Sequence, residues 1–360
     1  MTAQLRVLVV DDSASSRRLL VDILDRDPDL LVAGEAGDGD EAVRQAERVR
    51  PEVIVMDVLM PVLDGLAATR LIMERWPTPI VLVSAGVDSQ ETGRSFEAMQ
   101  AGALTLLAKP RGPGHPDFAA QAAALRATVK LMADVKVVRR RPAGPTRPVV
   151  AAAGDGPARR VRIAAIAAST GGPAALATIL AALPADPPVP ILVVQHIAAT
   201  FHQGLADWLD AVCPLTVQVA TDGRLLRPGE VLIAPGDRHL GVSRTGRVVL
   251  SPAPPVGSHR PSATYLFSSI ARVFGADAVG VILTGMGDDG AAGLLELGAA
   301  GGLVLAQDEA SSVVFGMPRE ACATGAVDRV VPLAEMAGAL ASAWAAAPVP
   351  GRTRLAVRQR

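Results

Sequence analysis

A serine, a histidine and a pair of aspartates each follow an apolar, strand-like run in the second half of the chain. Ser169 follows residues 163–168, His196 follows residues 191–195, and Asp288 and Asp289 come shortly after residues 281–283. In an open parallel sheet the carboxyl ends of the strands face one crevice, so these side chains can meet there. They are the groups of a nucleophile, its base and the acid that orients the base. The sequence therefore predicts a serine hydrolase in this half.

The residues after Ser169 predict how its hydroxyl is presented. Thr-Gly-Gly-Pro follows it, and Pro suits the first turn of a helix, so the segment predicts a strand, a tight turn and a helix start. Free N–H groups at such a point attract an anion and can stabilise an oxyanion. Two alternatives remain: a dinucleotide-phosphate turn, although G-x-G-x-x-G is absent, or a serine that only caps the helix. The G-x-S-x-G elbow of many hydrolases is incomplete because Ala167 replaces its first glycine.

The other histidines are weaker candidates for a base. His202 is expected on the following helix and exposed, whereas His115, His239 and His259 fall in polar or loop-like stretches without a nearby nucleophile signal. His196 could itself be structural, and spacing does not choose between the two aspartates. A metal bound by His196 and the aspartates is conceivable, but no His-x-x-His or cysteine cluster supports zinc.

Polar and charged side chains also follow successive strand-like runs of the first half. They are Asp11 and Asp12 after residues 5–10, Asp57 after residues 53–56, Ser84 after residues 80–83 and Lys109 shortly after residues 104–107. Three crowded carboxylates repel one another, and a hard cation such as Mg²⁺ offsets this repulsion. A carboxylate beside Mg²⁺ can accept a phosphoryl group, with which Lys109 would pair. The chain has only three lysines, so one at this position indicates a need for a compact charge.

The elements that must position these residues alternate in type. Strand-like runs at 5–10, 53–56, 80–83 and 104–107 are separated by amphipathic stretches such as 13–27 and 39–49, and a second alternation covers 161–346. This pattern predicts two α/β domains with doubly wound, mostly parallel sheets. In the second domain, residues 231–234 and 248–250 are expected to form a β-hairpin.

Length and composition set the domain limits. A chain of 360 residues favours two domains. We expect the first over residues 1–138, an Arg-, Pro- and Gly-rich linker over 139–160, the second over 161–347, and a disordered basic tail over 348–360.

Charge and apolar runs exclude several classes of protein. A net charge of −1 gives no reason to expect nucleic acid or an anionic membrane as a partner. Cys213 and Cys322 form no CxxC motif, which favours reduced thiols in a cytosolic protein. No signal peptide or long apolar span is recognisable, so we expect a cytoplasmic location without membrane insertion.

The first half resembles a two-component response-regulator receiver domain, a flavodoxin-like fold, over about residues 4–130. The matching residues are Val-Val-Asp11-Asp12, Asp57-Val-Leu-Met-Pro61, Asp64-Gly65, Ser84 and Lys109-Pro110. The resemblance implies that a histidine kinase phosphorylates Asp57, that Asp11, Asp12 and Asp57 hold Mg²⁺, and that Ser84 and Lys109 form the phosphoryl switch. Leu106 stands where the family often has an aromatic residue, a departure from switching by an aromatic rotamer.

The second half is similar to the catalytic domain of the chemotaxis protein-glutamate methylesterases, the CheB family, a Rossmann-like serine hydrolase domain. The matching segments are Ala168-Ser169-Thr170-Gly171-Gly172-Pro173, Gln195-His196, Leu283-Thr284-Gly285-Met286-Gly287, Asp289-Gly290-Ala291, and others such as Arg260-Pro261-Ser262. The resemblance implies Ser169 as nucleophile, His196 as base and Asp289 as orienting acid, with Thr170 and Met286 supporting the oxyanion.

The combined resemblance implies a function. It is hydrolysis of glutamate methyl esters, and deamidation of certain glutamines, on the cytoplasmic domains of methyl-accepting chemoreceptors. A chemotaxis histidine kinase would be the phosphodonor, the receiver would need Mg²⁺, and the esterase chemistry would need no cofactor. We expect the unphosphorylated receiver to cover the crevice that holds Ser169. An inactive phosphorylated scaffold and a small-molecule esterase remain the alternatives.

Asp288 is a departure from the family, which usually has Asn at this position. If its carboxylate faces the site, it favours the protonated form of His196. We therefore expect Asp288→Asn to shift the pH–rate profile to lower pH, and a profile identical to that of the wild type would refute this effect.

Overall fold

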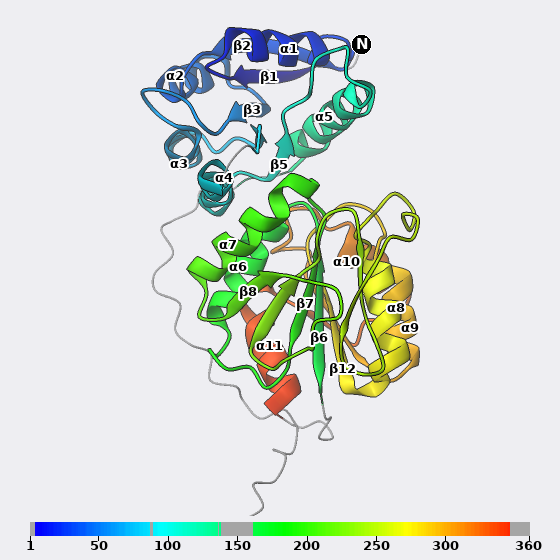
Figure 1. The fold of residues 1–360 in the computed structure, drawn as a ribbon. Helices are drawn as coiled ribbons and strands as arrows, with labels where there is room; N and C mark the ends of the chain where they lie inside the picture. Colours follow the sequence, from blue (N-terminus) through cyan, green and yellow to red (C-terminus); the bar gives the residue numbers. More distant parts are fainter. Residues whose placement is uncertain (1–3, 87–88, 136, 138–160, 346–360) are drawn as a thin grey trace, which may run out of the picture.

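The computed structural model describes residues 4–86, 89–135, 137 and 161–345, and these form two α/β domains, one above the other in Figure 1. The expected linker and basic tail lie outside the described residues. The predicted fold class, two mostly parallel α/β sheets flanked by helices, is confirmed.

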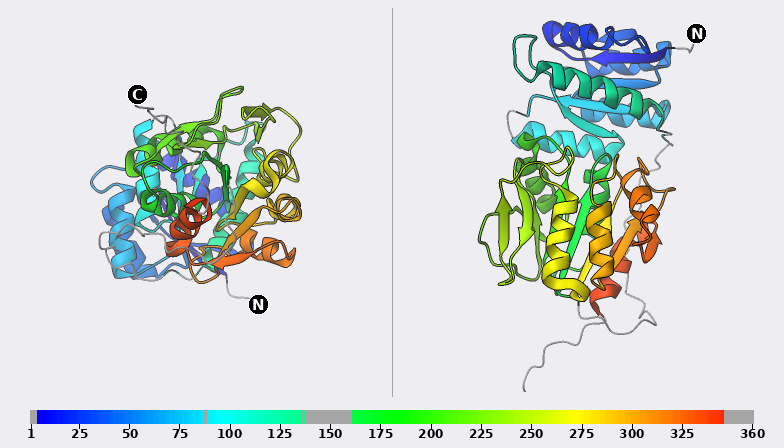
Figure 2. Two further views of the ribbon diagram at one scale, coloured as in Figure 1. Left: turned by 90° about the horizontal axis from the view of Figure 1, so that it is seen from below. Right: turned by 90° about the vertical axis from the view of Figure 1, so that its right-hand side faces the viewer.

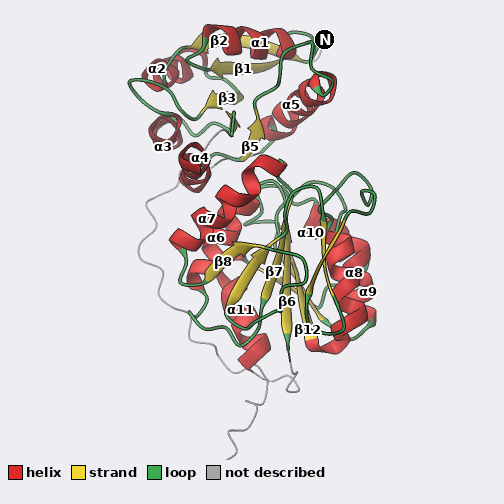
Figure 3. Cartoon of the chain, viewed as in Figure 1, coloured by secondary structure: helices red, strands yellow, loops and turns green. Residues whose placement is uncertain are grey.

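The N-terminal domain is a parallel sheet of five strands in the order β2-β1-β3-β4-β5. The side chains of Ser13, Asp38 and Asp64 cap its first three helices by accepting a backbone N–H. Helices α2, α3 and α4 cover one face, and α1 and α5 cover the other (Figure 3). In chain order the elements are β1 (Leu5–Val10), α1 (Ala14–Leu24), β2 (Leu30–Ala36), α2 (Gly39–Val49), β3 (Val53–Asp57), α3 (Gly65–Arg75), β4 (Ile80–Ser84), α4 (Ser89–Ala101), β5 (Thr105–Ala108) and α5 (Phe118–Ala133).

The C-terminal domain is a parallel sheet of seven strands in the order β14-β13-β12-β6-β7-β9-β8. Its central strands are buried on both faces, as expected of strands made of apolar and small residues apart from Gln195 at the end of β7. Helices α6, α7 and α11 cover one face, and α8, α9 and α10 cover the other (Figure 2). The strands are β6 (Ile163–Ala168), β7 (Ile191–Gln195), β8 (Thr216–Val219), β9 (Glu230–Ile233), β10 (His239–Val242), β11 (Val248–Ser251), β12 (Ala278–Ile282), β13 (Leu303–Gln307) and β14 (Arg329–Val331). The α-helices are α6 (Gly172–Ala182), α7 (His202–Val212), α8 (Ala263–Phe274), α9 (Ala291–Ala299), α10 (Met317–Ala323) and α11 (Leu333–Ala345).

The pairing predicted for the β-hairpin is wrong. β9 runs parallel to both β7 and β8 inside the main sheet, and the antiparallel partner of β11 is β10. The turn that closes the hairpin is at residues 243–246, where the Gly246 N–H donates to the Ser243 carbonyl. β10 was missed because it begins with a histidine and contains Gly241, so it does not read as an apolar run.

The two domains pack directly against each other. Helix α4 of the first domain lies on α6 and α7 of the second, and the buried rings of Phe96 and Trp208 stack with centroids 5.4 Å apart. The α4 and α7 backbones approach so closely that a Cβ at Gly204 would lie 2.2 Å from Thr92 Cγ2. One buried apolar cluster therefore runs through both domains.

Among the described residues, no helix is both long and apolar enough to cross a bilayer.

Candidate active site

The residues singled out in the second domain lie at the carboxyl ends of neighbouring strands. Ser169 directly follows β6, His196 directly follows β7, and Asp289 lies in the loop after β12. β6 lies between the other two strands, and the chain leaves it towards β7 on one side but returns to β12 on the other. In open α/β sheets, ligands bind in the crevice at such a switch point.

The turn that carries Ser169 is held from two sides. The Ser169 N–H donates to the Thr284 carbonyl at 3.0 Å, and the Ser169 carbonyl accepts from the Gln195 side-chain amide at 2.7 Å. Gly171 has a φ of 77°, and a Cβ at Gly172 would lie 2.0 Å from Gln195 Oε1, so both positions need glycine. The predicted strand, tight turn and helix start are all present, and α6 begins at Gly172.

Asp289 is fixed by four hydrogen bonds. His196 Nε2 lies 2.9 Å from Oδ2, which also accepts the Ala263 N–H at 2.7 Å. Oδ1 accepts from Ser262 Oγ at 2.7 Å and from the Thr264 N–H at 3.0 Å. Burial raises the pKa of Asp289, but the bonds from His196, Thr264 and Ser262 outweigh it and hold this pKa well below its usual range. Asp289 is therefore an ionised carboxylate that accepts a hydrogen bond from the Nε2–H group of His196.

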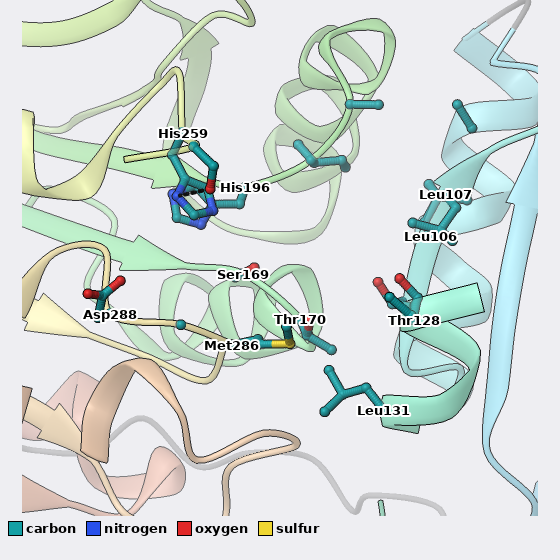
Figure 4. A pocket seen from close by; sticks show the side chains of 17 residues that line it. Leu106, Leu107, Thr128, Leu131, Ser169, Thr170, His196, His259, Met286 and Asp288 are labelled. Carbon is teal, nitrogen blue, oxygen red and sulfur yellow. Dashed lines mark hydrogen bonds between the residues drawn. The ribbon is translucent and has the colours of Figure 1, made fainter. Parts of the chain in front are cut away.

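The opposite nitrogen of His196 is the one available for chemistry. His196 Nδ1 is buried and has no hydrogen-bond partner among the described residues. Because Nε2 keeps its proton and donates a hydrogen bond to Asp289, Nδ1 carries the free lone pair of the neutral ring. His196 and Ser169 line the same cavity (Figure 4).

Thr170 and Met286 lie beside Ser169 in this cavity (Figure 4). In the described part of the chain, neither donates its backbone N–H to another residue. The Met286 side chain is 53% exposed although it is large and apolar. Two undonated N–H groups beside a serine hydroxyl can stabilise negative charge that develops on a carbonyl oxygen.

The first domain closes the other side of the cavity. The cavity has a volume of about 460 Å³. Besides residues of the C-terminal domain it is lined by β5 and α5 of the N-terminal domain: Thr105, Leu106, Leu107, Ala108, Ala127, Thr128 and Leu131. The Gly171 N–H, one residue from Thr170, donates to the Leu104 carbonyl across the domain boundary at 3.2 Å. In this arrangement the N-terminal domain stands over Ser169.

Asp288 and Asp289 are adjacent in sequence but lie in different environments. Asp288 is exposed, lines the same cavity and makes no side-chain hydrogen bond with another described residue. The structure thus brings Asp289, and not Asp288, into contact with His196.

Three histidines differ from their sequence-based expectations. His239 was expected in a polar or loop-like stretch but begins β10 and is fully buried. His202 was expected to be exposed but is only 3% exposed, because it begins α7 beneath the loop from His196 and its Nδ1 contacts the Ala199 carbonyl. His259, which was not singled out, stacks on His196 with ring centroids 4.1 Å apart. The available signal was its place three residues before Ser262, which caps α8 and contacts Asp289.

Ligand atoms of His196, His259 and Asp289 lie within 4.8 Å of one another, as a metal site would require. The two imidazoles, however, are stacked at 19°, so their in-plane lone pairs do not converge on one point. Both oxygens of Asp289 already accept two hydrogen bonds each. This geometry suits an oriented base better than a metal centre.

The acidic residues of the N-terminal domain meet as their spacing predicts. Carboxylate oxygens of Asp11, Asp12 and Asp57 lie within 4.8 Å of one another. Lys109 Nζ lies 2.6 Å from Asp57 and 2.9 Å from Asp11. Burial raises the pKa of Asp57 to about 6, although Lys109 opposes this shift. Three hard oxygen donors in one place suit Mg²⁺.

Ser84 is linked to the helix that contacts the second domain. Its Oγ donates to Glu91 Oε1 on α4 at 2.6 Å, and the Ala85 N–H donates to the same oxygen at 3.0 Å. Thr92, the next residue of α4, and Phe96, just over one turn further along, both contact α7.

Comparisons with known proteins agree with the family resemblance of each half of the chain. The family model for the CheB methylesterase matches residues 164–340, and that for the response regulator receiver domain matches residues 7–115. A "Protein-glutamate methylesterase/protein-glutamine glutaminase 4" of Myxococcus xanthus (strain DK1622) is 52% identical over 343 residues, 94% of this chain and 97% of that protein. A similarly named protein, with the number 3, of Anaeromyxobacter dehalogenans (strain 2CP-C) is 53% identical over 91% of this chain and 95% of its own length. The Thermotoga maritima CheB methylesterase catalytic domain is 39% identical with a TM-score of 0.49, covering 50% of this chain and 97% of that structure. Because identity of this order extends over nearly the whole length, the chain belongs to the CheB methylesterase family and carries an N-terminal response regulator receiver domain.

Proposed function

We propose that this protein hydrolyses glutamate methyl esters, and deamidates specific glutamines, on the cytoplasmic domains of methyl-accepting chemoreceptors. The observation that carries the proposal is the hydrogen-bonded His196–Asp289 pair: its Nδ1 has no partner among the described residues, and His196 lines the same cavity as Ser169. The names of the two bacterial relatives support both activities.

The proposed reaction proceeds through an acyl-enzyme. Ser169 Oγ attacks the ester carbonyl while His196 Nδ1 takes its proton, and the Thr170 and Met286 N–H groups support the oxyanion. His196 then gives that proton to the leaving methoxide, which departs as methanol. Water attacks the acyl-enzyme, with His196 again as base, and releases the glutamate and the free serine. A glutamine follows the same path with ammonia as the leaving group.

Asp289 would orient the base throughout. Its low pKa keeps it ionised, so it stabilises the imidazolium that forms on His196 without taking the proton itself.

The receiver is proposed to restrain this site until Asp57 is phosphorylated. Its β5 and α5 stand over the cavity, which supports an inhibited resting state. Asp11, Asp12 and Asp57 would hold Mg²⁺, which shields the charge of the incoming phosphoryl group. Lys109 would then pair with the phosphoryl group, and Ser84 would exchange Glu91 for a phosphoryl oxygen.

The Ser84–Glu91 bond offers a route from phosphorylation to the domain interface. Glu91 lies on α4 one residue before Thr92, which contacts α7, so losing the Ser84 bond loosens α4 at that contact. This route does not need an aromatic rotamer, which agrees with Leu106 at the usual aromatic position. Leu106 instead lies buried against the cavity.

The partners follow from the proposal. A chemotaxis histidine kinase would supply the phosphoryl group, and the reaction would take place in the cytoplasm, where the receptor substrates present their methylated helices. The domain limits 1–138, 139–160 and 161–347 remain our proposed division of the chain.

We expect Asp57→Asn to remove all stimulation by a phosphodonor while leaving the resting rate unchanged. Asn resembles the unphosphorylated carboxylate in shape but cannot form the acyl phosphate. The measurement is methanol release from methyl-labelled receptor membranes with and without acetyl phosphate and Mg²⁺. Chelation of Mg²⁺ should mimic the substitution in the wild-type protein. Stimulation that survives in Asp57→Asn would contradict the assigned phosphorylation site.

A further inference from the structure

The ring of His259 covers one face of the ring of His196. The centroids are 4.1 Å apart and the planes differ by 19°, and Figure 4 shows both imidazoles at the edge of the cavity. His259 is half-buried and lines both this cavity and a neighbouring groove along α9 and α10. The reaction proposed above assigns no part to it.

The segment that carries His259 also builds the surroundings of Asp289. A backbone bridge joins Val256 and His259 through two reciprocal N–H···O bonds of 3.2 and 3.1 Å. Three residues later, Ser262 caps α8 and donates to Asp289. One short stretch of chain therefore fixes both the acid and the ring that lies on the base.

The bond between Asp289 and His196 leaves one freedom that this ring removes. A hydrogen bond at Nε2 fixes one atom of the imidazole but lets its plane rock about that point. A flat contact on the ring face fixes the plane, and with it the direction in which the opposite nitrogen points. For His196 that nitrogen is Nδ1, which has no other partner among the described residues to hold it.

We infer that His259 is a positioning residue that holds the His196 ring so that Nδ1 points at the Ser169 side of the cavity. The inference rests on the proposed function, because it assigns a role in the same reaction. His259 acts through ring contact and exclusion of water, and needs neither of its nitrogens to move a proton.

The charge state of His259 is compatible with this role. Burial lowers its pKa, and His196 lowers it further, while Asp289 and Asp288 oppose the shift. The remaining carboxylate along the adjoining groove is Glu320. A neutral ring stacked on His196 does not repel the imidazolium that forms during the reaction.

The test compares His259→Ala with His259→Phe in the full-length chain, phosphorylated to the same extent. Phe keeps a flat ring but has no nitrogen, whereas Ala opens the ring face of His196 to water. We expect Ala to lower kcat roughly tenfold, equivalent to about 1.4 kcal/mol, with a smaller change in KM. Phe should restore kcat to within about threefold of the wild type.

Tyr265→Leu is the matched control. Tyr265 lies in α8, the helix that follows the His259 segment, and its ring stacks on His239 with centroids 4.6 Å apart. Its substitution should lower thermal stability and leave kcat unchanged. A Phe variant as impaired as the Ala variant would show that a nitrogen of His259 is required and would overturn the inference. So would an Ala variant with wild-type kcat.

A measurement without substrate separates this inference from the proposed function. The carbon-bound ring protons of His196 should be shifted upfield in the wild-type NMR spectrum by the ring current of His259. The shift should vanish in His259→Ala and return in His259→Phe. Absence of the shift in the wild type would refute the stacking itself, whereas its presence in a protein that releases no methanol would refute only the proposed reaction.

Discussion

Ser169→Ala is expected to lower methanol release from methylated receptor membranes by at least ~10³-fold, because it removes the nucleophile while the rest of the site remains. The serine hydroxyl is the nucleophile in both ester hydrolysis and deamidation, so ammonia release from receptor glutamines should fall to the same extent. Both products should be measured with acetyl phosphate and Mg²⁺ present, so that the resting state does not limit the rate.

The substitution itself should leave the fold intact. The Ser169 backbone bonds to Thr284 and Gln195 do not involve its side chain. Thr178→Ala is the matched control, since Thr178 is exposed on α6 and its hydroxyl donates only to the Ala174 carbonyl. It should retain full activity. Release that persists in Ser169→Ala would leave the chain as a phosphorylated scaffold or place the chemistry elsewhere. Hydrolysis of p-nitrophenyl esters without any release from receptors would favour a small-molecule esterase.

Gly204→Ala is expected to raise the resting, unphosphorylated rate by about tenfold, towards the rate seen with a phosphodonor. A Cβ at Gly204 would lie 2.2 Å from Thr92 Cγ2, so the closed packing of α7 on α4 cannot accommodate it without a shift. Overpacking of this kind costs about 1–3 kcal/mol, which moves an open–closed equilibrium by roughly one to two orders of magnitude. In the catalytic domain alone the change is favourable, because Ala is a better helix former than Gly.

Gly93→Ala provides the matched control on the facing helix. A Cβ at Gly93 meets no atom within 4 Å, so the same chemical change should leave the resting rate unaltered. Methanol release should be followed for both variants without a phosphodonor, and then with one. If Gly204→Ala rests at the wild-type rate and still responds fully to the phosphodonor, the α4–α7 contact does not restrain the enzyme.

Much of this molecule could be read from its sequence because the reactive residues stand at the ends of apolar runs. Parallel strands place such residues in one crevice, which is why Asp11 and Asp57 meet in one domain, and His196 and Asp289 in the other. Spacing left Asp288 and Asp289 equivalent, since the choice depends on the α8 amino-terminus, which is close only in the fold.

The errors arose where packing, not pattern, decides. His202 looked exposed because it opens a helix, but the loop from His196 folds over it. β9 was paired with the wrong strand because polar turns flank it on both sides, and its partners β7 and β8 are set by the order of strands in the folded sheet. The His259 stack brings together segments more than sixty residues apart, so no local signal encodes it.

The aromatic pair Phe96–Trp208 limits how independently the two halves can be handled. Trp208 is only 5% exposed in the intact chain, and part of its cover is a residue of the other domain. A catalytic fragment freed of its receiver would present this indole and the neighbouring Phe201 ring to solvent, as an apolar patch of the kind that promotes self-association. Its solubility and its apparent rate would then change together, so a comparison of fragment with full chain measures surface chemistry as well as release from restraint. The two halves are separate domains in the sequence, but in the folded chain each domain covers apolar side chains of the other.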